Sequence, residues 1–280
     1  RPFWARARCP PRGGGRVPRI EAFLEDDGQG ALMVLEDLGD EMLETRLRAG
    51  APAEPLYEEA VDRLARLRAR AELRPDPGCV AFARSFDAGL YRWELEHFVE
   101  WGLEAWKGRK LSPAERATAD RAFDEVSRRL EAEPMGFTHR DYQSRNIMVL
   151  PGGTQAVIDF QDALLGPRQY DLVALLRDSY VELPAELVAR MAARYLEALA
   201  EAGGPRLDPG PFGELFDLVT VQRKLKDAGR FLFIDRVRGN PDFLRSIPAS
   251  LRYVREALGR RPDLRRLQEI LGRHVPELAR

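Results

Sequence analysis

Cysteine is scarce in this sequence of 280 residues, which contains only Cys9 and Cys79. The two are far apart, and neither belongs to a CxxC pair or a Cys/His cluster. This argues against a disulfide framework and against a zinc site. Such usage is typical of a reducing compartment, so we expect a cytoplasmic protein. No apolar run approaches the roughly 18 residues that a membrane helix needs, so we expect no membrane partner.

Lysine is also scarce, and neither sign of charge dominates. Lysine and arginine together number 44, aspartate and glutamate 45, and the formal net charge is −1. A general attraction to nucleic acid is therefore not expected. The only lysines are Lys107, Lys110, Lys224 and Lys226. The first 106 residues thus lack any lysine, which matters for the comparison with kinases below.

The pattern of apolar residues predicts an α+β protein. Short apolar runs at 17–24 and 31–36 flank Asp26-Asp27-Gly28 and predict a β-hairpin or two adjacent strands. The runs at 145–150 and 155–160 flank Pro151-Gly152-Gly153 and predict a β-hairpin. Apolar residues at three- and four-residue spacing predict amphipathic helices over 53–74, 80–106, 112–132, 168–180, 184–202, 211–228, 241–258 and 262–273. The chain therefore combines a small strand-containing part with a mainly helical part that has a β-hairpin at its centre.

Two segments carry residues suited to phosphoryl transfer. The first is the loop 139–146 (HRDYQSRN), and the second is Asp159-Phe160-Gln161 at the end of the second hairpin. Phosphoryl transfer needs a carboxylate that orients or deprotonates the attacking hydroxyl, and oxygen ligands that hold Mg²⁺ against the nucleotide phosphates. Asp141, Asn146 and Asp159 supply this set in order. Each element alone could arise by chance, but the ordered combination favours a phosphotransferase.

The loop resembles the catalytic loop of the protein-kinase superfamily, and residues 159–161 stand where that superfamily has DFG. The sequence is most similar to the aminoglycoside-phosphotransferase branch, which includes choline and homoserine kinases. Within it, the similarity is closest to bacterial kinases that phosphorylate N-acetylmuramate and N-acetylglucosamine at C1 during peptidoglycan recycling. The further matching segments are residues 35–40, 157–163, Gly166-Pro167 with 170–172, and Gln222-Arg223 with Leu225, Lys226 and Gly229.

This resemblance implies a two-lobe kinase-like fold that uses ATP and Mg²⁺. Residues 1–39 would be a truncated amino-terminal lobe with the hinge, and residues 40–280 a helical carboxyl-terminal lobe. Asp141 would be the catalytic base, and Asn146 and Asp159 the metal ligands. The nucleotide would be bound by the hinge, Glu36, Asp37 and Leu38, and by Gln143.

The sequence departs from the family ahead of the hinge. We find neither the glycine-rich strand pair nor the lysine that grips the nucleotide phosphates. Either the chain is an amino-terminally truncated kinase, which we expect, or it is a degenerate relative. In the first case the activity belongs to the full-length protein, and in the second the chain is a non-catalytic nucleotide-binding module.

The acceptor is expected to be a small molecule rather than a protein. The segment between Asp159 and Asp171 has no serine or threonine and no room for a long activation loop. The anomeric hydroxyl of an amino sugar is the favoured acceptor, with aminoglycosides, choline and homoserine as alternatives. A tryptophan-containing helical stripe, Trp93, His97 and Trp101, is interpreted as core rather than as a sugar-stacking surface. The candidate substrate-binding residues are Asp162, Arg145, Arg92, Glu94, Arg223 and Lys226. The oligomeric state is not predicted.

Overall fold

The computed structural model describes residues 16–24 and 32–280. The chain forms two compact units. The first unit contains the described parts of Arg1–Ser85, Gly136–Leu165 and Leu183–Leu207, and the second contains Phe86–Met135, Gly166–Glu182 and Asp208–Arg280. The units are interleaved along the chain and do not follow the expected division between residues 39 and 40, which stays a prediction.

The first unit begins with the predicted amino-terminal hairpin. Strands β1 (Ile20–Leu24) and β2 (Leu32–Leu35) pair antiparallel, and the ladder has an irregularity between Ile20 and Ala22. The backbone N–H of Glu36 continues this ladder by donating to the carbonyl of Arg19 at 2.8 Å. The expected Asp26-Asp27-Gly28 turn lies outside the described residues.

The second predicted hairpin is also present but shorter than expected. Strands β4 (Ile147–Val149) and β5 (Gln155–Val157) pair antiparallel around Gly152 and Gly153, whose positive φ angles of 83° and 85° suit glycine. Residues 145 and 146 do not extend β4, because they belong to the 3₁₀ turn η3 (Ser144–Asn146). The hairpin therefore begins directly where the predicted catalytic loop ends.

Both edges of this hairpin are paired with segments from the amino-terminal part of the chain. The N–H of Val149 donates to the carbonyl of Glu41 at 2.7 Å, and the N–H of Val157 donates to the carbonyl of Arg16 at 2.9 Å. Residues on either side of the β1–β2 hairpin are thus fixed against β4 and β5. The segment 36–39 is held near the hairpin as a result.

Two further strands, β3 (Gly136–Thr138) and β6 (Leu164–Gly166), pair with each other and were not predicted. Helix α3 (Ala53–Leu73) packs against β3, and its buried Arg68 donates to the carbonyls of Gly136 and Phe137 at 3.2 Å each. A Cβ at residue 136 would lie 2.7 Å from the Arg68 guanidinium, so glycine leaves room for this side chain to reach the strand. Strand β3 then leads directly into the loop 139–146.

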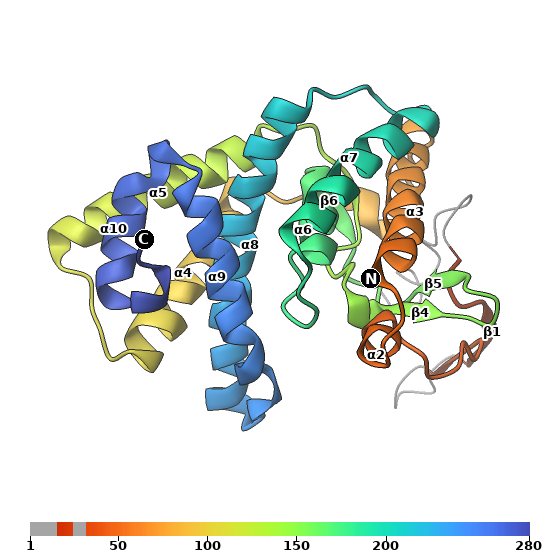
Figure 1. The fold of residues 1–280 in the computed structure, drawn as a ribbon, viewed down its shortest axis with the longest axis horizontal. Helices are drawn as coiled ribbons and strands as arrows, with labels where there is room; N and C mark the ends of the chain where they lie inside the picture. The colour runs from red at the N-terminus through yellow and green to blue at the C-terminus, as the bar shows by residue number, and fades with distance from the viewer. Residues whose placement is uncertain (1–15, 25–31) are drawn as a thin grey trace. The chain divides into compact units, whose positions relative to one another are not determined.

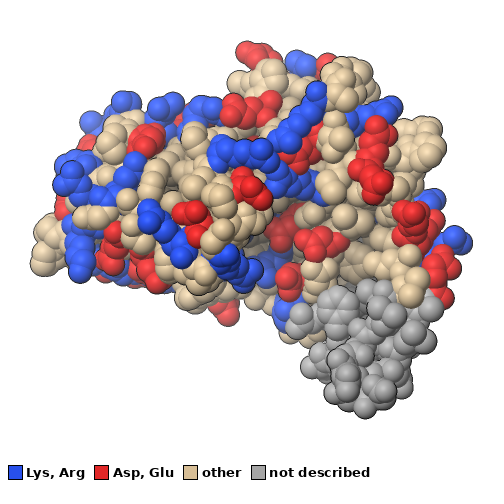
Figure 2. Space-filling model, turned by 90° about the horizontal axis from the view of Figure 1, so that it is seen from below, with Lys and Arg blue, Asp and Glu red and all other residues tan. Residues whose placement is uncertain are grey.

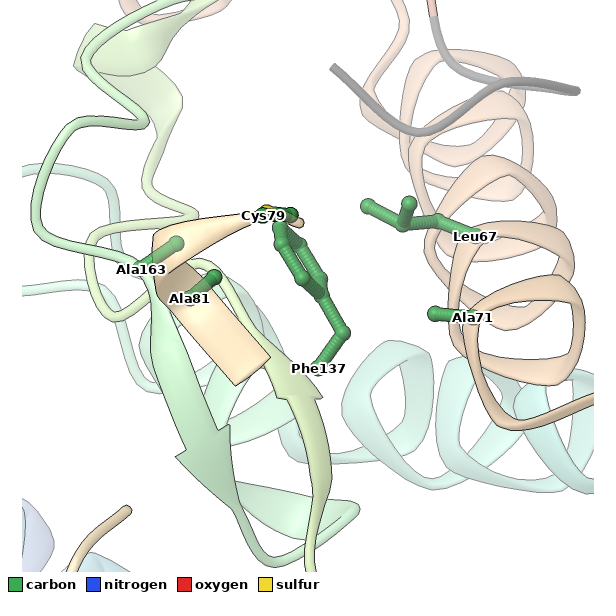
Figure 3. Close-up of a cluster of buried hydrophobic side chains, with 6 residues drawn as sticks. All are labelled: Leu67, Ala71, Cys79, Ala81, Phe137 and Ala163. Carbon is green, nitrogen blue, oxygen red and sulfur yellow. The ribbon is translucent and has the colours of Figure 1, made fainter. Parts of the chain in front are cut away.

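Helix α3 and strand β3 also share a small apolar cluster. Figure 3 shows Phe137 facing the helix-α3 side chains of Leu67 and Ala71. The remaining members are Cys79, Ala81 and Ala163. Cys79 is disulfide-bonded, against the expectation drawn from cysteine usage, and the other cysteine, Cys9, lies outside the described residues.

Two more helices complete the first unit. Helix α7 (Ala185–Glu201) lies along α3 in Figure 1, and Arg194 of α7 forms a two-bonded ion pair with Asp62 of α3 at 2.7 and 2.8 Å. The short helix α2 (Leu43–Arg48) packs against η3 and β4 and was not predicted. Its six residues are too few for a periodic signal.

The second unit is helical. Its elements are α4 (Ala88–Phe98), η2 (Val99–Trp106), α5 (Pro113–Glu131), α6 (Gln169–Leu176), α8 (Pro209–Arg238), η4 (Pro241–Ser246), α9 (Ile247–Gly259), η5 (Pro262–Leu264), α10 (Arg265–His274) and η6 (Pro276–Leu278). Helix α8 is central, since α4, α6 and α9 all pack against it (Figure 1).

Several helix boundaries in these segments differ from the prediction. The expected helix over 80–106 is divided: Val80–Ala83 form a 3₁₀ turn, η1, in the first unit, Asp87 caps the start of α4, and η2 is a π-helix. Helix α8 extends ten residues beyond the predicted end at 228, because Phe231 and Leu232 are still buried. It ends where Gly239 adopts a left-handed conformation, with φ of 66°.

The surface carries both signs of charge. On the face shown in Figure 2, basic and acidic side chains are interspersed, in keeping with a net charge near zero. Among the helices of the described residues, none has both the length and the apolarity needed to cross a bilayer.

Candidate active site

The backbone of the two predicted motifs is strained at one residue in each. Arg140, in the loop 139–146, has a φ angle of 75°, and Asp159 has a φ angle of 65°. They are the only non-glycine residues with positive φ in the described chain. A left-handed conformation is unfavourable for residues with a Cβ, and such strain persists where the surroundings impose it, often at functional sites.

The loop is attached to helix α3 by an aromatic side chain. The hydroxyl of the fully buried Tyr142 donates to the carbonyl of Ala60 at 2.9 Å. The buried ring of His139 stands edge-on to Tyr142, with 6.0 Å between the ring centroids. The ends of the HRDY segment are thus buried in the first unit, while Asp141 between them remains partly accessible.

Asn146 links the three residues predicted to carry the chemistry. Its side-chain Nδ2 donates to the backbone carbonyl of Asp141 at 2.8 Å, and its backbone carbonyl accepts from the N–H of Ile158 at 3.0 Å. Because one end of the amide is used as a donor, the orientation of the side-chain oxygen Oδ1 is fixed. Asp159 follows Ile158 directly, so Asp141, Asn146 and Asp159 converge within one small part of the first unit.

Asp159 lies at the surface after β5. Its carboxylate oxygen Oδ1 accepts a short hydrogen bond from Nε2 of Gln161. The side chain of Asp159 is exposed, whereas Gln161 is half-buried. The Asp159 carboxylate and the Asn146 amide oxygen are the kinds of donor that hard divalent cations prefer. The residues present therefore fit a magnesium ion.

A cavity of about 330 Å³ lies between the segment that follows β2 and the β4–β5 hairpin. This volume falls within the range of small-molecule sites. The lining is mainly apolar and includes the carboxylate-bearing Asp159. The lining residues are Pro18, Leu35, Glu36, Asp37, Leu38, Gly39, Met148, Ile158, Asp159, Phe160 and Gln161. The predicted hinge and the predicted metal ligand thus share one cavity within a single unit.

The hinge segment is held by its neighbours. The carboxylate of Glu36 accepts from the guanidinium of Arg16 at 2.7 Å and from the N–H of Arg19 at 3.2 Å. The side chain of Asp37 accepts from the N–H of Gly39 at 2.8 Å, and Gly39 has a φ angle of 77°. The side chains of Glu36 and Asp37 are therefore engaged in fixing the segment that lines the cavity.

Some residues of this site were not identified from the sequence. Pro18 lines the cavity, and Arg16 joins Glu36 to β5. Neither residue belongs to a motif that the sequence analysis could recognise. Arg16, Glu36 and Val157 come together only through tertiary pairing.

The other predicted residues of the first unit differ in environment. Gln143 is 9% exposed, and its backbone carbonyl accepts from the N–H of Asn146 at 2.8 Å. The guanidinium of Arg145 is bound to Glu44 of α2, with Nε at 2.5 Å from the carboxylate. Asp162 is exposed. The roles assigned to these residues stay predictions.

Four predicted substrate-binding residues belong to the second unit. Arg92 pairs with Glu96, Asp120 and Asp124. The buried Glu94 accepts from Nε2 of Gln222 at 2.7 Å, and the fully buried Arg223 lies over the ring of Tyr170, 4.8 Å from its centroid. The amino group of Lys226 lies 3.1 Å from the carboxylate of Asp227. The structure gives all four of them partners within their own unit, and their predicted contact with substrate stays a prediction.

The chain is similar to known phosphotransferases in sequence. Residues 7–209 match the model of a family described as "Phosphotransferase enzyme family". An N-acetylmuramate/N-acetylglucosamine kinase of Pseudomonas aeruginosa is 36% identical over 97% of this chain and 77% of that protein. A protein of the same name from Pseudomonas putida is 33% identical over 91% of this chain and 72% of that protein.

The fold is also similar to that of solved kinase structures. Choline kinase LicA from Streptococcus pneumoniae matches 86% of this chain and 74% of its own length, with a TM-score of 0.57 and 13% sequence identity. At this low identity the match concerns the fold alone. It confirms the kinase-like α+β fold expected from the motifs.

Proposed function

Because this chain belongs to the phosphotransferase enzyme family, we propose that it transfers the γ-phosphate of ATP to a hydroxyl group of an amino sugar. The observation that carries the proposal is the pair of hydrogen bonds that Asn146 makes. Its side chain donates to the backbone carbonyl of Asp141, and its backbone carbonyl accepts from the N–H of Ile158, the residue before Asp159. The predicted base and the two predicted metal ligands are thereby linked, and one of them, Asp159, lines a ligand-sized cavity.

The cavity suits the adenine ring of ATP. Leu35, Met148 and Ile158 provide apolar walls for a flat ring. Glu36 and Leu38 both line the cavity, and we assign the carbonyl of Glu36 and the N–H of Leu38 as the acceptor and donor for the adenine edge.

Asn146 and Asp159 would hold Mg²⁺. The described residues contain no group of three or more His, Cys, Asp or Glu side chains that could bind a metal alone. The remaining ligands would therefore be oxygens of the nucleotide phosphates and water, as is usual for magnesium. When bound, the ion neutralises the negative charge of the phosphates.

Asp141 would act on the acceptor. Its carboxylate orients the attacking hydroxyl and takes its proton as the oxygen forms a bond to the γ-phosphorus. The bond between that phosphorus and the bridging oxygen breaks, and ADP leaves with the electron pair. The backbone carbonyl of Asp141 is fixed by Asn146, and the next residue, Tyr142, is anchored to α3. The loop therefore holds the carboxylate in place before the substrate binds.

The acceptor that the sequence relatives favour is N-acetylmuramate or N-acetylglucosamine, both named for the relatives in two Pseudomonas species. We assign the anomeric hydroxyl as the site of transfer and peptidoglycan recycling in the cytoplasm as the setting. Phosphorylation of the anomeric hydroxyl activates the sugar, because the phosphate at C1 is a good leaving group in later transfer reactions.

The proposal is tested with the purified full-length protein, ATP and Mg²⁺. ADP release is measured with N-acetylmuramate, N-acetylglucosamine, kanamycin, choline and homoserine, and the product is identified by phosphorus NMR. We expect turnover with the two amino sugars, an anomeric phosphate resonance, and loss of turnover in Asp141→Asn. Turnover with only kanamycin, choline or homoserine, or a phosphate on another hydroxyl, would contradict the proposed acceptor.

A further inference from the structure

Helices α4 and α8, with the π-helix η2, bring four aromatic rings together on the second unit. The ring of His97 lies 5.6 Å from Trp93, 6.1 Å from Trp101 and 5.5 Å from Phe233, measured between centroids. Trp101 and Phe233 also meet edge-on at 5.1 Å. We call these four residues the aromatic platform.

Trp93 does not behave as a core residue. Its side chain is 60% exposed, one of the most exposed large apolar side chains in the described chain, while its ring is nearly parallel to that of His97 at 23°. The interpretation of the stripe as plain core is therefore wrong for Trp93. One face of the Trp93 indole stacks on His97, and the opposite face is open to solvent.

His97 lies beneath this surface with an unused polar atom. The residue is only 9% exposed, and its Nε2 has no hydrogen-bond partner among the described residues. Burial lowers the pKa of His97, the carboxylate of Glu100 acts in the opposite direction, and Arg230 and Lys226 lower it further. The imidazole is consequently neutral at pH 7 and offers a ring nitrogen that a ligand hydroxyl or amide could satisfy.

Arg230 provides a cation at the same place. Its guanidinium lies over Phe233, 4.9 Å from the ring centroid. Within residues 16–24 and 32–280, no carboxylate lies within ion-pair distance of it, whereas Arg92 on α4 has three such partners. A partly exposed arginine held by an aromatic ring is well placed to bind a carboxylate through two hydrogen bonds.

The close contact of the two helices fixes this arrangement. Gly229 of α8 lies against the backbone of α4, where an added Cβ would be 2.9 Å from the carbonyl oxygen of His97. This close approach of α8 to α4 places Arg230 and Phe233 next to His97 and Trp101. The platform is therefore built from two helices packed backbone to backbone and does not depend on a flexible loop.

From these observations we propose that the aromatic platform and Arg230 form a subsite for the pyranose ring of an acidic amino sugar. One ring face would stack on Trp93, His97 Nε2 would meet a polar substituent, and Arg230 would bind the carboxylate. The inference rests on the proposed function and concerns the binding of the sugar by the second unit alone.

The chemistry of the platform favours a sugar over an apolar protein surface. The exposed indole stands beside charged side chains, with Glu96 and Glu100 nearby on the same helical stretch, and a polar ring nitrogen lies at its base. Sugars combine apolar C–H faces with hydroxyls and so match this mixture. A protein partner would need a larger continuous apolar area.

The first test concerns Trp93. KM for each sugar, KM for ATP and kcat are compared in the wild type, Trp93→Leu and Trp93→Tyr, and sugar binding is measured separately by calorimetry. We expect Trp93→Leu to raise KM and Kd for both sugars about tenfold, with KM for ATP unchanged, and Trp93→Tyr to restore most of the loss. Trp106→Leu is the matched control, because Trp106 lies on η2 under Lys107 and outside the platform.

The second test separates the carboxylate from the rest of the sugar. N-acetylmuramate carries a carboxylate and N-acetylglucosamine does not. Arg230→Gln should raise KM for N-acetylmuramate about tenfold and leave KM for N-acetylglucosamine unchanged. Arg230→Lys should bring KM for N-acetylmuramate part of the way back to the wild-type value. Arg236→Gln, which changes an exposed arginine further along α8, should have no such selectivity.

These measurements distinguish failure of the inference from failure of the proposed function. If the wild type phosphorylates the sugars and Trp93→Leu binds them equally well, the platform is not a sugar subsite. If the sugars bind in a Trp93-dependent manner without phosphoryl transfer, the proposed function fails and the subsite stands. If Trp93→Leu changes only the oligomeric state, measured by light scattering, the platform is a contact between copies of this chain and our inference is wrong.

Discussion

The buried carboxylate of Glu44 in α2 accepts a hydrogen bond from Nε of Arg145, which lies 101 residues further along the chain, at 2.5 Å. The same carboxylate pairs with the exposed Arg48 at 2.5 Å. Arg145 directly precedes Asn146, so this pair attaches the end of the candidate catalytic loop to α2. Arg145 was predicted to bind substrate, and the observed pair gives it a positioning role in addition.

We expect Glu44→Gln to lower kcat about tenfold with little change in KM for ATP. The substitution removes the charge opposite the half-buried Arg145, so the guanidinium and the residue after it lose a fixed position. Stability should fall by about 1–3 kcal/mol, measured by urea unfolding. Arg48→Gln is the control, because it removes only the exposed partner of Glu44. An equal loss of kcat in both variants would show that the pair with Arg145 is not responsible.

Asp141→Asn tests the base. The amide keeps the shape of the side chain but cannot accept the hydroxyl proton. General-base catalysis typically contributes ~10²–10⁴-fold, so kcat should fall within that range while ATP affinity is retained. Steady-state kinetics and ATP titration measure the two quantities. Turnover close to the wild type would exclude this role for Asp141.

Asp159→Ala and Asn146→Ala test the metal ligands. Each removes an oxygen donor, so the Mg²⁺ concentration that gives half-maximal nucleotide binding should rise in both. Asn146 also donates to the carbonyl of Asp141. Asn146→Asp separates its two roles, because it keeps an oxygen ligand and loses the donor. We expect it to retain magnesium dependence near the wild type and to lower kcat. Unchanged magnesium titrations in both alanine variants would contradict the assignment.

Gly229→Ala tests the packing of α8 on α4. The new Cβ would lie 2.9 Å from the carbonyl oxygen of His97 and 3.0 Å from the Cα of Phe98, and backbone atoms cannot turn aside as a side chain could. We expect a loss of about 1–3 kcal/mol in the free energy of unfolding. Gly213→Ala, in the same helix, meets nothing within 4 Å and should stabilise by about 0.5–1 kcal/mol. A loss of equal size in both variants would indicate a backbone effect unrelated to packing.

The start of α5 should contribute stability that depends on pH. Ser112 and Glu115 form a reciprocal capping box, and hydrogen bonds from the Ser112 backbone and hydroxyl, with a contribution from Arg273, lower the pKa of Glu115 to about 2. A lowered pKa stabilises the folded state above the ordinary carboxyl range, and this contribution is lost as pH falls from about 4.5 toward 2. The difference in Tm between the wild type and Glu115→Gln should therefore shrink across that interval. A difference independent of pH would contradict the capping role.

The elements with strong local signals were predicted from the sequence. Pro151-Gly152-Gly153 between two apolar runs gives the β4–β5 hairpin, because glycine alone readily adopts the positive φ angles of its turn. The Ser112-Pro113 start of α5 is confirmed by the observed cap. The spacing of Asp141, Asn146 and Asp159 likewise predicted their convergence, since a hairpin returns the chain to its starting point.

Elements without a periodic signal were missed. Strands β3 and β6 have three residues each, too few for an alternating pattern. The change from α4 to the π-helix η2 leaves no mark in apolar spacing. Their conformations are set by neighbours such as Arg68, whose guanidinium binds the carbonyls of β3 from a distant part of the chain.

The sequence by itself determined the order of the catalytic motifs and the local turns that carry them, because hydrogen bonding and backbone preferences within a few residues are sufficient for those features. Only the tertiary structure decided which charged side chains are buried and which partners they have. Glu44 with Arg145 and Glu36 with Arg16 are paired across long separations. Such pairs depend on how helices and strands pack, and residue type alone does not distinguish a solvated arginine from the fully buried Arg223.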